Sequence, residues 1–192
     1  IINPILSLAS PKVYSIPMII IMGWRGAPGI KDEPQHLHQG DIMENLVRTM
    51  DFPYEILSKN EKKAFLQTKK ALKVAKLKSS PFFIFVNKDT FKKTKSIRNS
   101  NPFNLNREEA ISQTLSFLPD ESLIVSTTGM CSRELYELRV KKSSGTHRDF
   151  LTVGGMGHAS QIALGISKSL EDRFIFCFDG DGAALMHMGS LA

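Results

Sequence analysis

Cysteine is scarce in this sequence, and no long apolar segment interrupts it. The 192 residues include two cysteines, Cys131 and Cys177, without a Cys-x-x-Cys spacing. This excludes a local cysteine-based metal site, and we expect two free thiols in a reducing, cytoplasmic compartment. The longest apolar run, residues 16–22, is far shorter than the roughly 20 residues that span a bilayer. It is expected to form a buried strand, and no membrane partner is predicted.

The N-terminus also lacks a charged region followed by a long apolar core, so no signal peptide is expected. There is no initiator methionine, and the first residue need not be the natural start. Hydrophobic residues make up 42% and charged residues 23%, as in ordinary soluble globular proteins.

The net charge of +6 has its excess mostly in residues 59–78 and 88–98, where aromatic residues are few. This pattern favours a solvated helix face and a linker over a nucleic-acid surface, so no nucleic-acid partner is predicted. The alternative is that this positive charge produces a modest electrostatic field that attracts anionic substrates.

Short apolar runs alternate with helical patterns along the chain. Strands are predicted at residues 16–22, 54–57, 81–86, 123–125, 150–153 and 173–178. Helices are predicted at residues 38–50, 61–78, 107–118, 132–142 and 158–170, with a last one opening at 179–182. Such alternation gives an α/β fold of parallel sheets with flanking helices. Residues 88–106, rich in Lys, Asn, Ser and Thr, are interpreted as a linker between residues 1–87 and 107–192.

Three predicted strand ends in the second half carry glycine and small polar residues. They are Ser126-Thr127-Thr128-Gly129, Gly154-Gly155-Met156-Gly157 and Gly180-Asp181-Gly182-Ala183. Ligands of parallel sheets bind beyond the carboxyl ends of the strands, and helix N-termini there favour phosphate. One such turn has an ordinary structural explanation, but the three together indicate a phosphate or diphosphate site.

Asp181 distinguishes this pattern from a generic turn. A carboxylate among phosphate-binding glycines repels the ligand unless a cation such as Mg²⁺ lies between them, so Asp181 is a candidate metal ligand. The dinucleotide fingerprint fits poorly, because Gly180-Asp181-Gly182 is not followed by glycine at the expected position. Thr127 and Thr128 could also simply cap the next helix.

These segments resemble the thiamin-diphosphate-dependent 2-oxoacid decarboxylases. Residues 180–191 are similar to the start of the thiamin-diphosphate motif, and residues 126–130 and 150–165 resemble the loops that precede it. Residues 17–40 are similar to the latter part of the pyrimidine-binding domain of the enzymes that act on phosphonopyruvate or sulfopyruvate. The resemblance covers nearly the whole chain, and residues 87–106 match least.

The resemblance implies a thiamin-diphosphate-binding fold with parts of two domains. Residues 1–87 would be the C-terminal part of the pyrimidine-binding domain, and 107–192 the N-terminal part of the diphosphate-binding domain. The implied activity is decarboxylation of 3-phosphonopyruvate to phosphonoacetaldehyde and CO₂, with thiamin diphosphate and Mg²⁺, in a homo-oligomer. Sulfopyruvate decarboxylation and a noncatalytic truncated homologue are the alternatives. An activating glutamate and asparagine metal ligands are expected outside these residues, so the fragment alone is expected to be inactive.

The resemblance also implies roles for individual residues. Asp181 would ligate Mg²⁺, and Met156 would hold the cofactor in its bent shape. The other implied cofactor contacts are Thr127, Thr128, Gly155, Gly180, Gly182 and Ala183. The predicted catalytic residues are Gln35, His36 and Arg25: His36 as a proton relay, and Arg25 as a bidentate partner for a phosphonate or carboxylate. The alternatives are that His36 belongs to an exposed polar loop and that Arg25 is an ordinary surface arginine. His36 is favoured over His38 for the proton relay, and His158 and His187 are interpreted as structural.

Overall fold

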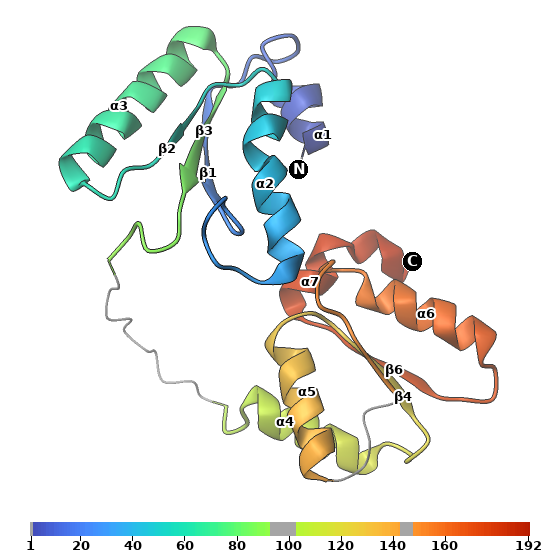
Figure 1. Ribbon diagram of the computed structural model, residues 1–192. Helices are drawn as coiled ribbons and strands as arrows, with labels where there is room; N and C mark the ends of the chain where they lie inside the picture. The colour runs from blue at the N-terminus through green and yellow to red at the C-terminus, as the bar shows by residue number, and fades with distance from the viewer. Residues whose placement is uncertain (1, 93–102, 143–147) are drawn as a thin grey trace. The chain divides into compact units, whose positions relative to one another are not determined.

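The computed structural model describes residues 2–92, 103–142 and 148–192 (Figure 1). The chain divides into two compact units, Ile1–Ile97 and Arg98–Ala192, and each contains one three-stranded parallel sheet. The predicted α/β class with parallel sheets and flanking helices is confirmed. Residues 93–102 of the predicted linker lie outside the described residues. No helix in the described ranges is long and apolar enough to cross a membrane.

The first unit has the strand order β1-β3-β2. After α1 (Ile2–Pro4) and a π-helical turn η1 (Ile5–Ala9), its elements are β1 (Met18–Gly23), α2 (Pro34–Thr49), β2 (Tyr54–Ile56), α3 (Glu61–Lys78) and β3 (Pro81–Val86). The central strand β3 pairs with β1 from Met18↔Pro81 to Gly23↔Val86. Every residue of β3 up to Phe85 is buried, as its continuous apolar sequence predicts.

Alternate residues of β3 face opposite helices. Phe83 and Phe85 pack on one face with Val47 of α2, whereas Phe82 and Ile84 pack on the other face with α3. The α3 side of that contact is made of small residues, Ala71 and Ala75. The predicted bounds of α3 and β3 are confirmed.

The start of α2 corrects the prediction. The sequence was interpreted as a polar loop up to a helix at residues 38–50, but α2 begins at Pro34. Proline fits the first helical position, because its fixed φ suits the helix and the missing N–H has no intrahelical partner there. Gln35 and His36 therefore lie in the first turn of a helix, not in a loop.

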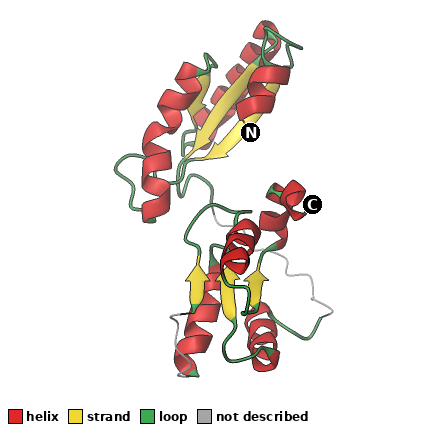
Figure 2. Cartoon of the chain, turned by 90° about the vertical axis from the view of Figure 1, so that its right-hand side faces the viewer, coloured by secondary structure: helices red, strands yellow, loops and turns green. Residues whose placement is uncertain are grey.

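The second unit has the strand order β5-β4-β6. Its elements are α4 (Arg107–Phe117), β4 (Leu123–Ser126), α5 (Met130–Lys141), β5 (Asp149–Leu151), α6 (Ala159–Ser169), β6 (Ile175–Phe178), α7 (Asp181–Met186) and a 3₁₀ turn η2 (Met188–Leu191). In Figure 2 its three strands run side by side in one direction. Asn106 caps α4, where Asn106 and Glu109 form a reciprocal capping box.

Successive residues of β4 divide the second core between two faces of the sheet. Ile124 packs with Leu135 and Leu138 of α5 and with Ile111 of α4. Val125 points to the opposite face, where it packs with α6. Helices on both faces leave the carboxyl ends of the strands as the edge from which the three glycine-containing loops emerge.

Leu135→Ala is expected to destabilise the second unit by about 2–5 kcal/mol, because it leaves a cavity in the core between α5 and the sheet. Leu135 is 0% exposed, whereas Val140 on the same helix is 54% exposed. Val140→Ala is therefore the matched control, with an expected change within about 0.5 kcal/mol. Urea unfolding followed by circular dichroism measures both, and equal effects would contradict this account of the core.

Candidate functional site

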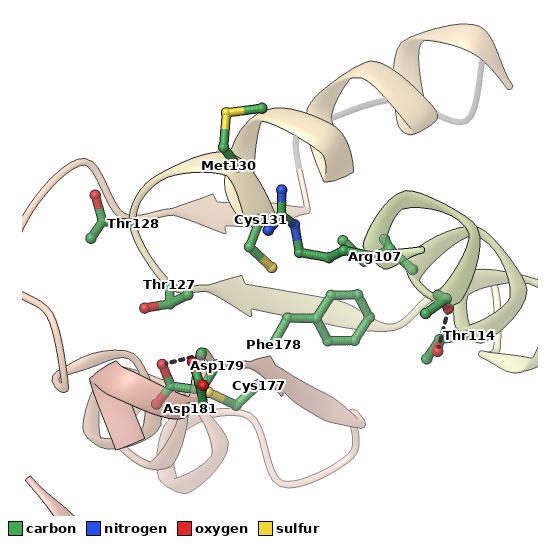
Figure 3. Close-up of a pocket in the computed structure, with 13 residues that line it drawn as sticks. Arg107, Thr114, Thr127, Thr128, Met130, Cys131, Cys177, Phe178, Asp179 and Asp181 are labelled. Carbon is green, nitrogen blue, oxygen red and sulfur yellow. Dashed lines mark hydrogen bonds between the residues drawn. The ribbon is translucent and has the colours of Figure 1, made fainter. Parts of the chain in front are cut away.

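The topology of the second unit opens a crevice between β4 and β6. From the central strand β4 the chain crosses through α5 to β5 on one side, then returns through α6 to β6 on the other side. Connections that diverge in this way leave a crevice at the carboxyl ends of the two neighbouring strands. A pocket of about 550 Å³ lies there, within the size range of small-molecule sites (Figure 3).

Both strand ends contribute polar residues to this pocket. Thr127 and Thr128 follow β4, and Asp179, Gly180 and Asp181 follow β6. The N-terminal residues of α5, Met130 and Cys131, also line it. The first N–H groups of a helix have no intrahelical acceptor, so this end of α5 presents backbone donors and a positive dipole to an anion.

Hydrogen bonds below the pocket hold the strand ends together. The N–H of Thr127 donates to the carbonyl of Phe178 at 2.8 Å, which joins β4 to β6 beyond the regular strand. Oγ of Ser132 donates to the carbonyl of Thr127 at 2.7 Å, and Oγ1 of Thr152 donates to that of Ser126 at 2.8 Å. All of these groups except Phe178 belong to buried residues, so the pocket floor is preorganised.

Two carboxylates share one wall of the pocket (Figure 3). Oδ1 of Asp179 accepts from the N–H of Gly180 at 2.9 Å, and Oδ1 of Asp181 accepts from the N–H of Gly182 at 2.8 Å. Neither aspartate pairs with a Lys, Arg or His side chain in the described part of the chain. Two carboxylates without a positive partner favour a hard divalent cation between them and an anionic ligand.

The described ranges contain no group of three or more His, Cys, Asp or Glu side chains placed to hold a metal ion. Asp179 and Asp181 would therefore supply part of a coordination sphere, with other oxygen ligands completing it. Mg²⁺ fits such a site, because it commonly takes one or two carboxylates together with phosphate oxygens and water.

Arg107 and two thiols, Cys131 and Cys177, also line the pocket. Arg107 is held by Glu134 through Nε–Oε2 and Nη2–Oε1 contacts of 2.6 and 2.7 Å, and this hydrogen bonding lowers the pKa of Glu134. Cys131 and Cys177 are both free. Burial, then the negative charge of Asp179 and the neighbouring Cys131, raises the pKa of Cys177, so its thiol stays protonated at neutral pH.

The third strand end does not line this pocket. Gly155, Met156, Gly182 and Ala183 are absent from its wall, so of the eight predicted cofactor contacts the structure brings Thr127, Thr128, Gly180 and Asp181 to the pocket. Met156 is 43% exposed, and Ala183 is buried at 2% exposure. The roles of all eight residues stay predictions.

In the first unit, Arg25, Asp32 and His36 form one cluster. Nε and Nη2 of Arg25 donate to Oδ2 and Oδ1 of Asp32 at 2.7 and 2.5 Å. Nδ1 of His36 lies 3.1 Å from Oδ1 of Asp32 and 3.0 Å from Nη2 of Arg25. The N–H groups of Gly26 and Glu33 also donate to the Asp32 carboxylate at 2.8 Å. The hydrogen bonds from Arg25, followed by those from Glu33, Gly26 and His36, hold the pKa of Asp32 far below its usual range.

This cluster constrains two of the three predicted catalytic side chains, those of Arg25 and His36. Guanidinium nitrogens only donate, so Nδ1 of neutral His36 can accept from Arg25, whereas a protonated Nδ1 donates to Asp32. In both states Nε2 is left for another partner. Arg25 has already used Nε and one N–H of Nη2 on Asp32, so a bidentate anion would have to use its remaining N–H groups. Its side chain is 61% exposed and lines a pocket with Lys31 and Lys88.

A close backbone contact fixes this cluster in place. The loop after β1 crosses α2 where a Cβ on Gly40 would lie 1.9 Å from the carbonyl oxygen of Gly26. Nε1 of the buried Trp24 donates to the carbonyl of Gly40 at 2.9 Å. The loop that carries Arg25 and the helix that carries His36 are therefore locked to each other.

Sequence reasoning missed two aspartates. Asp179 directly follows an apolar strand, two residues before Asp181, so its signal was visible in the sequence. Asp32 was not among the predicted site residues. Its role depends on the Arg25 contact across seven residues, which no short motif indicates.

Comparison with known proteins finds a family match within the second unit and relatives that align with the chain. Residues 127–192 match the thiamine pyrophosphate enzyme, C-terminal TPP binding domain. The chain is 32% identical to a phosphonopyruvate decarboxylase of Streptomyces viridochromogenes, over 99% of this chain and 50% of that protein. It is also 32% identical to a phosphonopyruvate decarboxylase of Streptomyces hygroscopicus, over 99% of this chain and 49% of that protein. A sulfopyruvate decarboxylase subunit beta of Methanothermobacter thermautotrophicus is 42% identical over 87 residues, 45% of this chain and 43% of that protein.

The chain thus spans about half the length of the curated relatives it matches over its full extent. The resemblance inferred from residues 126–130, 150–165 and 180–191 is confirmed, since these segments lie in or next to the matched region.

Gly40→Ala is expected to destabilise the first unit by about 1–3 kcal/mol, because the new Cβ overlaps the carbonyl of Gly26. In an unobstructed helix the same change would stabilise by about 1 kcal/mol, so the sign is diagnostic. Urea unfolding measures the effect, with Gln39→Ala, an exposed neighbour on α2, as the control. A stabilised Gly40→Ala variant would show that the loop and α2 are not in contact.

Asp32→Asn is expected to lower stability in a pH-dependent way. The folded-state pKa of Asp32 is depressed, so its contribution is present above the unfolded pKa and lost as the pH falls. The difference in unfolding free energy between wild type and Asp32→Asn should be greatest above about pH 5 and shrink below about pH 4. Urea titrations across this range test it, with Asp41→Asn, exposed on α2, as control. A constant difference down to pH 2 would refute the ion-pair account.

Proposed function

We propose, from the membership of residues 127–192 in the C-terminal domain family of thiamine pyrophosphate enzymes, that this chain forms part of a thiamin-diphosphate- and Mg²⁺-dependent 2-oxoacid decarboxylase. The observation that carries the proposal is the pocket between β4 and β6, with Thr127, Thr128, Asp179 and Asp181 on its wall. All four residues lie within the part of the chain that matches the family.

The pocket suits a diphosphate bound through a cation. Thr127 and Thr128 offer hydroxyl groups, and the N-terminus of α5 offers backbone N–H groups for phosphate oxygens. Asp181, with Asp179 beside it, would hold Mg²⁺ through the carboxylate oxygen that does not accept from its neighbouring backbone N–H. Without such a cation, the two carboxylates would oppose the binding of any anion.

When bound, thiamin diphosphate supplies an electron sink for the electron pair released with CO₂. The residues of this chain would position it and manage charge and protons. Asp181 and the two threonines would anchor the diphosphate end. His36, oriented through Nδ1 by Asp32 and Arg25, would hold or donate a proton at Nε2. Gln35, in the same turn of α2, would act beside it.

The substrate we propose is 3-phosphonopyruvate, converted to phosphonoacetaldehyde and CO₂. Relatives with the corresponding name align over 99% of this chain, which includes both units. Arg25, with Lys31 and Lys88 beside it, provides positive charge for a dianionic tail. Sulfopyruvate is the second candidate, because sulfopyruvate decarboxylase subunits beta align with 45% of this chain at up to 42% identity.

The two units would correspond to parts of two domains. Residues 1–87 would belong to a pyrimidine-binding domain and residues 107–192 to a diphosphate-binding domain, joined by residues 88–106. We further propose a homo-oligomeric protein of the cytoplasm, in keeping with its two free thiols. The subunit names of the sulfopyruvate relatives describe assemblies of more than one chain, which is consistent with association.

Asp181→Asn is expected to weaken Mg²⁺-dependent thiamin diphosphate binding at least tenfold in the full-length protein, because the neutral amide is a poorer ligand for Mg²⁺. The amide oxygen can still accept from the N–H of Gly182, so the local turn is preserved. Isothermal titration calorimetry with thiamin diphosphate, with and without Mg²⁺, measures the effect.

Asp172→Asn, at an exposed position before β6, serves as the control and should bind like wild type. Absence of binding by well-folded wild type would favour the noncatalytic homologue. If binding is found, CO₂ release from phosphonopyruvate and from sulfopyruvate identifies the preferred acid.

A further inference from the structure

Two histidines from separate parts of the second unit meet at the loop after β5. His158 precedes α6 and His187 follows α7, and their rings pack edge to face with centroids 4.5 Å apart. The proposed function uses neither histidine. Both rings contact the short segment 154–157, which carries Met156 at its centre.

Each ring holds one side of this segment. Nδ1 of His158 donates to the carbonyl of Gly155 at 3.0 Å, and the N–H of His158 reaches the same oxygen at 3.2 Å. The His187 ring lies directly against Gly157, where a Cβ would come within 2.5 Å of its Nδ1. The same Cβ would lie 2.9 Å from the carbonyl oxygen of Ala183, so α7 itself also presses on the segment.

In the backbone of this segment, Met156 lies between two glycines with positive φ angles. Gly155 and Gly157 have φ values of +69° and +86°, in the region that favours glycine. Met156 itself is 43% exposed, so its side chain projects from the segment rather than packing into the core. The position of its side chain is therefore set by what holds Gly155 and Gly157, namely His158 and His187.

Helix α7 links this arrangement to the pocket. Asp181 is its first residue, and His187 immediately follows its last. A second tie reinforces the link, because Nε2 of Gln161 in α6 donates to the carbonyl of Ser190 at 2.6 Å. The helix that presents Asp181 to the pocket thus also supports the loop that presents Met156.

We infer that His187, together with His158, is a positioning residue that sets Met156 relative to the Asp181 end of α7 for contact with the bound cofactor. This inference rests on the proposed function, because that function supplies the cofactor that Met156 would contact. The contacts that hold segment 154–157 do not depend on it. His187 acts through the loop and touches neither cofactor nor substrate.

Two measurements on the full-length protein test it. The first is hydrogen–deuterium exchange of peptides that cover residues 152–158, without cofactor. His187→Ala should speed exchange there at least fivefold by removing the ring that packs on Gly157. Met188→Ala, the adjacent residue with an exposed side chain, is the control and should leave exchange unchanged.

The second measurement is a double-mutant cycle on thiamin diphosphate affinity in Mg²⁺. His187→Ala should weaken affinity about tenfold in wild type but less than twofold in a Met156→Ala background, because the side chain that it positions is gone. His187→Phe, which keeps a ring over Gly157, should restore most of the affinity. A merely structural role would give the same loss in both backgrounds.

The outcomes separate the two proposals. Unchanged loop exchange, or a loss of affinity that is equal in both backgrounds, would overturn the positioning role of His187. Faster exchange in His187→Ala, combined with no thiamin diphosphate binding by folded wild type, would overturn the proposed function and the cofactor role of Met156. The contacts that hold the loop would still be supported in that case.

Discussion

The parallel pairing of β4 with β5 on one side and β6 on the other is the constraint on which the candidate site depends. It brings three loops from distant parts of the sequence to one edge of a sheet, and it makes the crossovers diverge between β4 and β6. The pocket follows from this divergence rather than from any single residue. The burial of Ile124 and Val125 on opposite faces keeps the pairing in register, because a shift by one residue would exchange the two cores.

Much of the fold could be predicted because its signals are local. The lysine-rich helix α3 has an asparagine cap and a regular apolar stripe, and β3 is a continuous apolar run, so their bounds were visible in the sequence. The predicted helix at residues 38–50 began too late, because α2 begins at Pro34, and proline suits the first helical turn. The first turn of α2 therefore includes Gln35 and His36, which the predicted helix left out.

The site was predictable to the extent that it consists of strand ends. Thr127, Thr128, Gly180 and Asp181 follow apolar strands and reach one pocket. The contact of His187 with Gly157 joins residues 30 positions apart, and neither residue carries a local signal for it. The Arg25–Asp32–His36 cluster depends likewise on a loop folding back over α2. Contacts of this kind follow from the tertiary arrangement, which periodicity does not reveal.

Asp32 differs from the pair Asp179 and Asp181 in how its charge is balanced. Asp32 has an arginine, a histidine and two backbone N–H groups around it, so its charge is compensated within the chain. Asp179 and Asp181 have backbone N–H groups but no basic side chain among the described residues. The first carboxylate organises its neighbours, whereas no Lys, Arg or His side chain of the described residues balances the charge of the second pair.

The crossing of Gly26 over Gly40 has a mechanical consequence. With two backbones in direct contact and Trp24 hydrogen-bonded across them, the loop and the first turns of α2 have no side-chain layer that could deform independently. The loop and these turns therefore behave as one rigid unit, and any displacement of His36 must carry Arg25 with it.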